Sequence, residues 1–397
     1  MTNQAAFTNQ AVVGAPEPTV RRRDPASLDL SRPWLSRLPL AWPLLASVEL
    51  GREKAMALQA FGLPLLLLRG ADGVASAHID RCPHRQVSFF AGPQPPLVEG
   101  DTVRCPFHFQ TFNQQGRCVR TLHGESGELE ALLSLPLLEE GGFLWLPLSS
   151  SLFSDRGHLA MAPEQVEAAR AGIRLPKEFE QLNDPIRFRC HPLFDYRYPC
   201  GPWGLTITSG IDHTHGFQVH GIARVVHRLR RWFGAETLSG MHLVRSDEER
   251  SVLVTYEQFR DSLRAYWKVG GAPNLWLNKL DEGLYIAVLF VPEDSKATMT
   301  RGCIYIDSHT WGALEFQPFL NRLRDLSIQN SEEDRPFIES QARYLDQGEL
   351  PIGFASLNDA PVYHFFRYLE QMTGTPIDFG FAKASVQELV ARNFWSS

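Results

Sequence analysis

The sequence has few cysteines, no long apolar run and no excess of positive charge, and each shortage excludes a class of protein. Six cysteines among 397 residues are too few for a disulfide scaffold, so we expect a reducing, cytoplasmic compartment and metal binding by any paired cysteines. The most apolar run, Leu63 to Leu68, is far shorter than the roughly 20 residues of a membrane span and predicts a buried strand. The 39 basic and 45 acidic residues give a net charge of −6, which argues against nucleic acid as a partner.

The chain divides into stretches of different character. Its 44% hydrophobic and 21% charged residues are an ordinary globular balance, and 397 residues predict two or three domains. Residues 1–33 have no apolar core and predict a flexible N-terminal arm, with an organelle-targeting peptide as the alternative. Residues 34–148 contain short apolar runs between Gly, Pro and Asp, which predict a small all-β domain. Residues 149–185 are polar and mixed, and predict a linker with a helical piece near Pro163–Ala171.

The pattern changes in residues 186–397, which we expect to form a second domain. Three segments alternate polar and apolar residues and predict antiparallel strands: Ser251–Phe259, Gly283–Val291 and Thr298–Ile306. Further on, apolar residues recur at spacings of three and four, which predicts a helix from about Phe316, and another helix is expected over Pro361–Gln371. The second domain is therefore predicted to be α+β, an antiparallel sheet with helices packed on it.

Two short segments each pair a cysteine with a histidine. Cys82 and His84 have the spacing Cys-x-His, and twenty residues later Cys105 and His108 have the spacing Cys-x-x-His. Two thiolates and two imidazoles suit tetrahedral zinc, and they also suit a two-iron cluster with both thiolates on one iron and both imidazoles on the other. Each segment supplies one ligand of each type, which is the arrangement that a mixed-ligand cluster needs.

The two segments resemble the Rieske iron–sulfur motif, and the resemblance covers about residues 40–148. It implies a [2Fe–2S] cluster in which Cys82 and Cys105 bind one iron and His84 and His108 bind the other. Imidazole in place of thiolate removes negative charge and raises the reduction potential, so such a cluster can accept an electron from a ferredoxin-like donor.

The chain departs from that motif beside the ligands. The family often has Gly where this chain has Gln86, and it usually has Gly-Trp where this chain has Phe109 and Gln110. Because Gly permits close backbone approach, the docking surface around His108 is expected to be unusual, although no ligand is lost.

A second constellation has the spacing Asp-x2-His-x4-His, at Asp212, His215 and His220. On a helix, the two histidines are five residues apart and share one face only if the helix loosens between them, which is typical of metal sites. Alone, the pair also fits an ordinary core or surface position. Behind a Rieske-type domain, it resembles the active site of the Rieske non-heme iron oxygenases, in which two histidines and a carboxylate hold Fe(II) and leave positions open for dioxygen.

The resemblance places the third iron ligand far along the chain, on a C-terminal helix. Asp334 fits this position best. Glu333 is its main rival, because neighbouring positions on a helix differ by about 100°, and Glu339 is a weaker rival.

Asp212 receives a different role from the resemblance. It lies three residues before His215 and can accept a hydrogen bond from that imidazole, which would fix its tautomer. The family implies that this aspartate is catalytic and bridges to a Rieske histidine of a neighbouring subunit, here His108 or His84. The alternative is an ordinary helix-cap or surface aspartate.

By this resemblance, the chain is a terminal oxygenase component with a helix-grip α+β catalytic domain. We expect it to use O2 to hydroxylate or oxidatively demethylate an apolar or aromatic substrate, as a monooxygenase. The alternatives are a cis-dihydroxylating dioxygenase, and an electron-transfer or binding protein with a silent second domain.

The sequence also lacks a nucleotide motif of its own. No Gly-x-Gly-x-x-Gly turn follows a strand and no second iron–sulfur motif is present, so we expect electrons from a separate ferredoxin or NAD(P)H-dependent reductase. A head-to-tail homotrimer is expected if a subunit's cluster is too remote from its own mononuclear iron. The remaining cysteines are expected to be buried thiols: Cys118, Cys190, Cys200 and Cys303.

Overall fold

The computed structural model describes residues 40–121, 131–148, 161–173, 175–212, 215, 219–221, 244–246, 251–258, 263–270, 274–312, 317–346, 362 and 365. The predicted arm over residues 1–33 and nearly all of the predicted helix over Pro361–Gln371 lie outside these ranges. Within the described part, no helix combines the length and the hydrophobicity that crossing a membrane requires.

The first region, from β1 to β11, is all-β as predicted, apart from one turn of 3-10 helix, η1 (Ser47–Glu49). Its strands form three small antiparallel sheets, with the orders β1-β11-β10, β2-β3-β4-β9 and β5-β6-β7-β8. The bounds are β1 Leu40–Ala46, β2 Lys54–Ala60, β3 Leu63–Arg69, β4 Ala75–Ile79, β5 Leu97–Glu99, β6 Thr102–Arg104, β7 Thr111–Asn113, β8 Cys118–Arg120, β9 Ser134–Leu135, β10 Leu138–Glu140 and β11 Phe143–Leu148.

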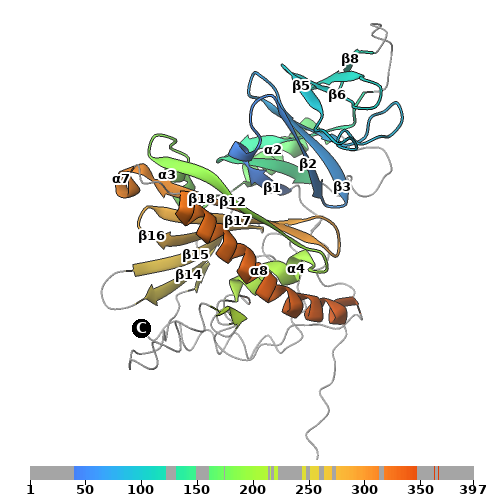
Figure 1. The fold of residues 1–397 in the computed structure, drawn as a ribbon. Helices are drawn as coiled ribbons and strands as arrows, with labels where there is room; N and C mark the ends of the chain where they lie inside the picture. The colour runs from blue at the N-terminus through green and yellow to red at the C-terminus, as the bar shows by residue number, and fades with distance from the viewer. Residues whose placement is uncertain are drawn as a thin grey trace, which may run out of the picture.

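The second region is built on a seven-stranded antiparallel sheet of order β12-β18-β17-β16-β15-β14-β13, with α8 lying across it (Figure 1). This α+β arrangement confirms the predicted class, and all three predicted strands are present as β14, β17 and β18. The strands are β12 Phe188–Tyr198, β13 Val244–Ser246, β14 Ser251–Gln258, β15 Leu263–Gly270, β16 Leu275–Asp281, β17 Leu284–Pro292 and β18 Thr298–Asp307. The helices are α2 Pro163–Gly172, α3 Glu178–Leu182, α4 Trp203–Ile211, α7 Ser308–Trp311 and α8 Gln317–Asp346.

The centre of this sheet is buried on both faces. All nine residues of β17 are buried, and both β1 of the first region and α4 pack against this strand. Gly210 lets α4 lie close to the sheet, since a Cβ atom there would stand 3.1 Å from the ring of Trp276 and 3.3 Å from that of Phe290. The sheet and α4 therefore form one rigid base beneath the residues that follow α4.

The two regions share one hydrophobic core and a buried ion pair. Trp42 of β1 packs edge-on against Trp203 of α4, with ring centroids 5.3 Å apart. Glu49 of η1 accepts a hydrogen bond of 2.8 Å from Arg301 of β18, and only about a tenth of either side chain is exposed (11% and 10%). Asp195 lies 3.4 Å from the same guanidinium group. These contacts fix how the first region sits on the sheet.

His78 is a fully buried histidine in β4. Its Nδ1 atom lies 2.9 Å from the hydroxyl of Ser134 and its Nε2 atom lies 3.1 Å from the hydroxyl of Ser76, so a neutral imidazole satisfies both contacts. Burial lowers the pKa of His78 to about 4. The unfolded chain binds a proton near pH 6.5, whereas the folded chain does not bind it until about pH 4.

Stability is therefore expected to fall as the pH drops from 6.5 to 4, by about 3 kcal/mol in total from His78 alone. Thermal unfolding of wild type and His78→Asn between pH 7 and 4.5 measures this loss, and the variant should lose less stability over that interval. His309→Asn, at an exposed position, is the matched control. Parallel pH profiles for wild type and His78→Asn would contradict the prediction.

Candidate metal centres

The first cysteine–histidine pair lies in a tight loop after β4. The Cys82 N–H donates to the carbonyl of Val87, and the Gln86 N–H donates back to the carbonyl of Cys82, each at 2.8 Å. Gln86 has a φ of 57°, in the left-handed region. The first loop therefore needs a positive φ at the position where the family often has Gly.

The second pair lies in a loop after β6 with the same hydrogen-bond pattern. The Cys105 N–H donates to the carbonyl of Gln110 at 2.8 Å, and the Phe109 N–H donates to the carbonyl of Cys105 at 3.1 Å. Phe109 has a φ of 56°. The two loops thus have equivalent backbone conformations. Gln86 and Phe109, which depart from the Rieske motif, both adopt the left-handed conformation, and this costs a residue other than Gly about 1–2 kcal/mol.

The four side chains of these loops converge. The Nδ1 atoms of His84 and His108 are 3.1 Å apart, and both thiols are buried behind them. The neighbouring Cys105 thiol and burial raise the pKa of Cys82, and the neighbouring Cys82 thiol lowers the pKa of Cys105 to about 6. Two soft sulfur donors on the inside and two nitrogen donors on the outside match a mixed-ligand cluster, in which one loop supplies one donor of each type.

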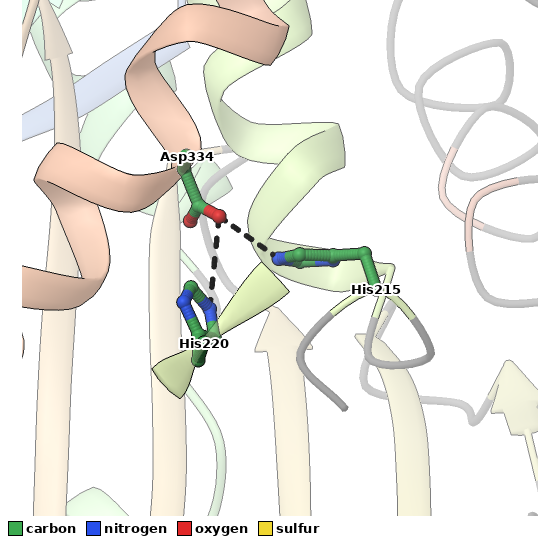
Figure 2. A group of neighbouring side chains, drawn as sticks. All are labelled: His215, His220 and Asp334. Atoms are coloured by element: carbon green, nitrogen blue, oxygen red, sulfur yellow. Dashed lines mark ion pairs between the residues drawn. The ribbon is translucent and has the colours of Figure 1, made fainter. Parts of the chain in front are cut away.

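A second convergence lies beyond the end of α4. Asp334 extends from α8 toward two imidazoles (Figure 2): its Oδ1 atom lies 3.2 Å from Nε2 of His215 and 3.6 Å from Nε2 of His220. The three donor atoms all lie within 4.8 Å of one another, and the three side chains are half-buried. Two imidazoles and one carboxylate around a common point are a donor set for a divalent transition metal.

The opposite edge of each imidazole is also held. Nδ1 of His215 donates to the backbone carbonyl of Asp212, and Nδ1 of His220 donates to the Glu333 carboxylate at 3.1 Å. These bonds place a proton on each Nδ1, so the lone pair of each Nε2 is free to bind a metal on the side of Asp334. Proteins orient metal-binding histidines in this way. Nε2 of His215 is buried and makes no hydrogen bond to the described residues, so a metal ion would satisfy it.

The charges of this site shift the pKa values of His215 and Glu333. Burial favours the neutral form of His215, but the carboxylates of Asp334 and Asp212 outweigh it and raise the pKa of His215. Burial opposes the charged form of Glu333, but bonds from the Gln329 amide, the Gly221 N–H and His220 lower the pKa of Glu333. The site is therefore electronegative and attracts a cation.

The structure separates the three acidic residues that the sequence offers as a third ligand. Asp334 faces both histidines, whereas Glu333 bonds the far edge of His220, and Glu339 forms an ion pair of 3.7 Å with Arg335. The adjacent residues Asp334 and Glu333 of α8 thus contact opposite edges of the His220 ring, Asp334 at Nε2 and Glu333 at Nδ1.

Other expected residues take different places. Asp212 caps α4, and it bonds His215 through its backbone carbonyl rather than through the carboxylate that the sequence suggests. The prediction of four buried thiols is wrong for Cys200, which is exposed in the turn between β12 and α4, and Cys118 and Cys190 are only half-buried. From the sequence, Gln110 stood out only as a departure from the Rieske motif. In the structure, its side chain is buried beside Cys82.

Comparison with known proteins identifies the first region. Residues 41–128 match the Rieske [2Fe-2S] domain. The oxygenase component of dicamba O-demethylase from Stenotrophomonas maltophilia is 31% identical over 119 residues, which are 30% of this chain and 34% of that protein. The oxygenase component of chloroacetanilide N-alkylformylase from Rhizorhabdus wittichii is 26% identical over 181 residues, 45% of this chain and 46% of that protein. The chain thus aligns with a third to a half of the length of these relatives.

Solved structures extend the likeness to nearly the whole chain. Dicamba monooxygenase bound to dicamba superposes with a TM-score of 0.59 at 17% identity, covering 88% of this chain and 98% of that one. The terminal oxygenase of carbazole 1,9a-dioxygenase from Nocardioides aromaticivorans superposes with a TM-score of 0.57 at 16% identity, covering 89% and 98%. Residues 41–128 are therefore a Rieske [2Fe-2S] domain, and the chain shares the fold of these two oxygenases.

The Rieske domain and the solved neighbours point to two cofactors, and both donor sets fit them. A Rieske domain holds a [2Fe–2S] cluster, and one of the solved neighbours is dicamba monooxygenase with non-heme iron. In this chain, the two equivalent loops suit such a cluster, and the three residues around Asp334 suit a single iron ion.

Proposed function

We propose that this chain is the terminal oxygenase component of a multi-component Rieske system that uses O2 to oxidise an apolar or aromatic substrate. The observation that carries the proposal is the convergence of His215, His220 and Asp334 in a chain that also contains a Rieske domain. An electron carrier with a silent second domain would have no use for this second donor set.

The proposed ligands follow from the two convergences. Cys82 and Cys105 bind one iron of the cluster, and His84 and His108 bind the other through Nδ1. The loops support this assignment because they place like donors together, thiol beside thiol and imidazole beside imidazole.

The single iron is held by Nε2 of His215, Nε2 of His220 and the carboxylate of Asp334. Iron bound in this way supplies the activation of O2. The protein determines the direction and protonation of the ligands, because the Asp212 carbonyl and the Glu333 carboxylate each hold an Nδ1 proton.

Electron transfer in this proposal runs between subunits. Figure 1 shows the sheet β5–β8 at the end of the first region that points away from α4 and α8. A head-to-tail homotrimer would bring the cluster loops of one subunit to the catalytic residues of the next. Asp212, through its contact with His215, is the proposed bridge to His108 or His84 of that neighbour.

The proposed reaction is monohydroxylation or oxidative demethylation. The names of the relatives support this choice, since they include an O-demethylase, an N-alkylformylase and a 4beta-methylsterol monooxygenase. The carbazole 1,9a-dioxygenase neighbour favours the alternative, a cis-dihydroxylating dioxygenase. Products formed from methylated and unmethylated aromatic substrates in 18O2 distinguish the two, because a dihydroxylation retains both oxygen atoms.

The electron donor is proposed to be a separate ferredoxin or an NAD(P)H-dependent reductase. One solved neighbour is an oxygenase and ferredoxin complex of carbazole 1,9a-dioxygenase, which supports a donor of this kind. The proposal keeps the reducing, cytoplasmic compartment that the low cysteine content predicts.

Iron and sulfide content with low-temperature EPR tests the proposal. Wild type should contain the two irons of the cluster and one more, and show a Rieske signal on reduction. His220→Ala should lose the single iron, lose substrate-dependent O2 uptake and retain the Rieske signal. His309→Ala, at an exposed position, is the control and should keep all the iron. Two irons in both wild type and His220→Ala would reduce the chain to an electron carrier.

A further inference from the structure

Gln110 connects the two cluster loops. Its backbone carbonyl accepts the N–H of Cys105 and closes the second loop at 2.8 Å. Its side chain is buried, with 7% exposed, and reaches the first loop, where its amide oxygen accepts the thiol proton of Cys82 at 3.6 Å. Phe109, with its positive φ, precedes it and fixes the direction in which Gln110 leaves the loop.

We propose that Gln110 sets the reduction potential of the Rieske cluster by donating an amide N–H hydrogen bond to the sulfur of Cys82. The inference rests on the proposed function, because it requires Cys82 to be a cluster ligand. It adds a residue that binds no iron and that the Rieske motif does not include.

The direction of the hydrogen bond follows from the state of the sulfur. A thiol can donate to the amide oxygen, but a cysteine bound to iron has lost its proton and can only accept. The glutamine amide carries an acceptor and two donors of nearly the same size at the end of one rotatable bond. A half turn about that bond places Nε2 where Oε1 lies, and the contact is kept without any movement of the backbone.

The effect on the potential follows from charge. Reduction adds negative charge to the cluster, and a hydrogen bond to a ligand sulfur stabilises the more negative state more strongly. The buried position of Gln110 strengthens the bond, because little water competes for the donor or the sulfur. Gln110 therefore favours the reduced cluster and makes it easier for an external donor to reduce.

The test is a redox titration of the holoprotein, followed by EPR of the reduced cluster. Gln110→Met keeps the length of the side chain and removes the N–H. Loss of a bond that favours the reduced over the oxidised cluster by about 1.4 kcal/mol is expected to lower the equilibrium constant for reduction about tenfold, which corresponds to a midpoint about 59 mV lower for one electron. The matched control is Gln114→Met, which removes amide bonds to Asp72 and to the Val74 carbonyl and should leave the midpoint unchanged.

A second measurement uses the unmodified sequence, and so does not depend on the folding of a variant. Wild type labelled with 15N in glutamine side chains should show a 15N coupling in pulsed EPR of the reduced cluster, and Gln110→Met should lack it. An intact Rieske signal with an unchanged midpoint, or with no 15N coupling in wild type, would overturn this inference alone. Absence of a Rieske signal from wild type would overturn the cluster assignment, and with it the inference.

Discussion

Replacing Glu333 with alanine is expected to weaken iron binding at the mononuclear centre by about 10- to 100-fold, the usual effect of removing the partner of a metal-binding histidine. Glu333 accepts the Nδ1 proton of His220 at 3.1 Å and the N–H of Gly221 at 3.2 Å. Without it, the imidazole loses the bond that directs Nε2 toward Asp334. Anaerobic Fe(II) titration against a competing chelator measures the change in affinity.

Two further substitutions separate orientation from charge. Glu333→Gln keeps an oxygen that can accept from Nδ1 of His220 and should retain more iron than the alanine variant. Glu339→Gln removes a carboxylate from the same helix, where it pairs with Arg335 at 3.7 Å, and should bind iron as wild type does. Iron affinities that fall equally in both glutamine variants would show that only net charge matters. Loss of the Rieske EPR signal in Glu333→Ala would show that the effect is not local.

Removing Glu49 alone is expected to destabilise the protein by about 3–5 kcal/mol, because it leaves the buried guanidinium of Arg301 without its main partner. Burial raises the pKa of Glu49 despite the opposing effect of Arg301, which shows how costly this charge is to bury. Asp195 is half exposed and 3.4 Å from Arg301, so it compensates only in part. Urea unfolding of Glu49→Ala measures the loss.

The double variant Glu49→Leu with Arg301→Met tests the cause of that loss. Replacing both charges with apolar groups should recover most of the stability, since a buried ion pair and an apolar pair of similar size often stabilise equally. Glu282→Ala breaks an exposed pair with Lys279 and should cost no more than about 1 kcal/mol. A double variant that is as unstable as Glu49→Ala would contradict the explanation.

Residues close together in the sequence could be predicted well. The two cysteine–histidine pairs were found from their spacing, whereas the family resemblance supplied the role of the histidines after α4. The sequence favoured Asp334 over Glu333 only through the family resemblance. A rotation of about 100° separates the two residues, and the packing of α8 against β12 and α4 sets that rotation.

The features that could not be predicted from the sequence depend on packing between residues that are distant in the chain. Residues 149–185 were predicted as a polar linker, yet α2 and α3 bury Ala169, Phe179 and Leu182 in the shared core. One or two buried residues per short helix leave little periodic signal. Burial of Gln110 was equally hidden, because it depends on the meeting of two loops that are twenty residues apart in the sequence.

The proposed mononuclear centre joins parts of the chain that are remote in sequence: His220 and Glu333 are 113 positions apart. With the proposed ligands, an ion bound there closes a loop that contains six strands of the seven-stranded sheet, β13 to β18. The ion binds only when α8 is in place, so its binding energy is also folding energy. An iron ion held by the proposed ligands would therefore link the end of α4 to α8, and loss of the metal is expected to weaken the packing of α8.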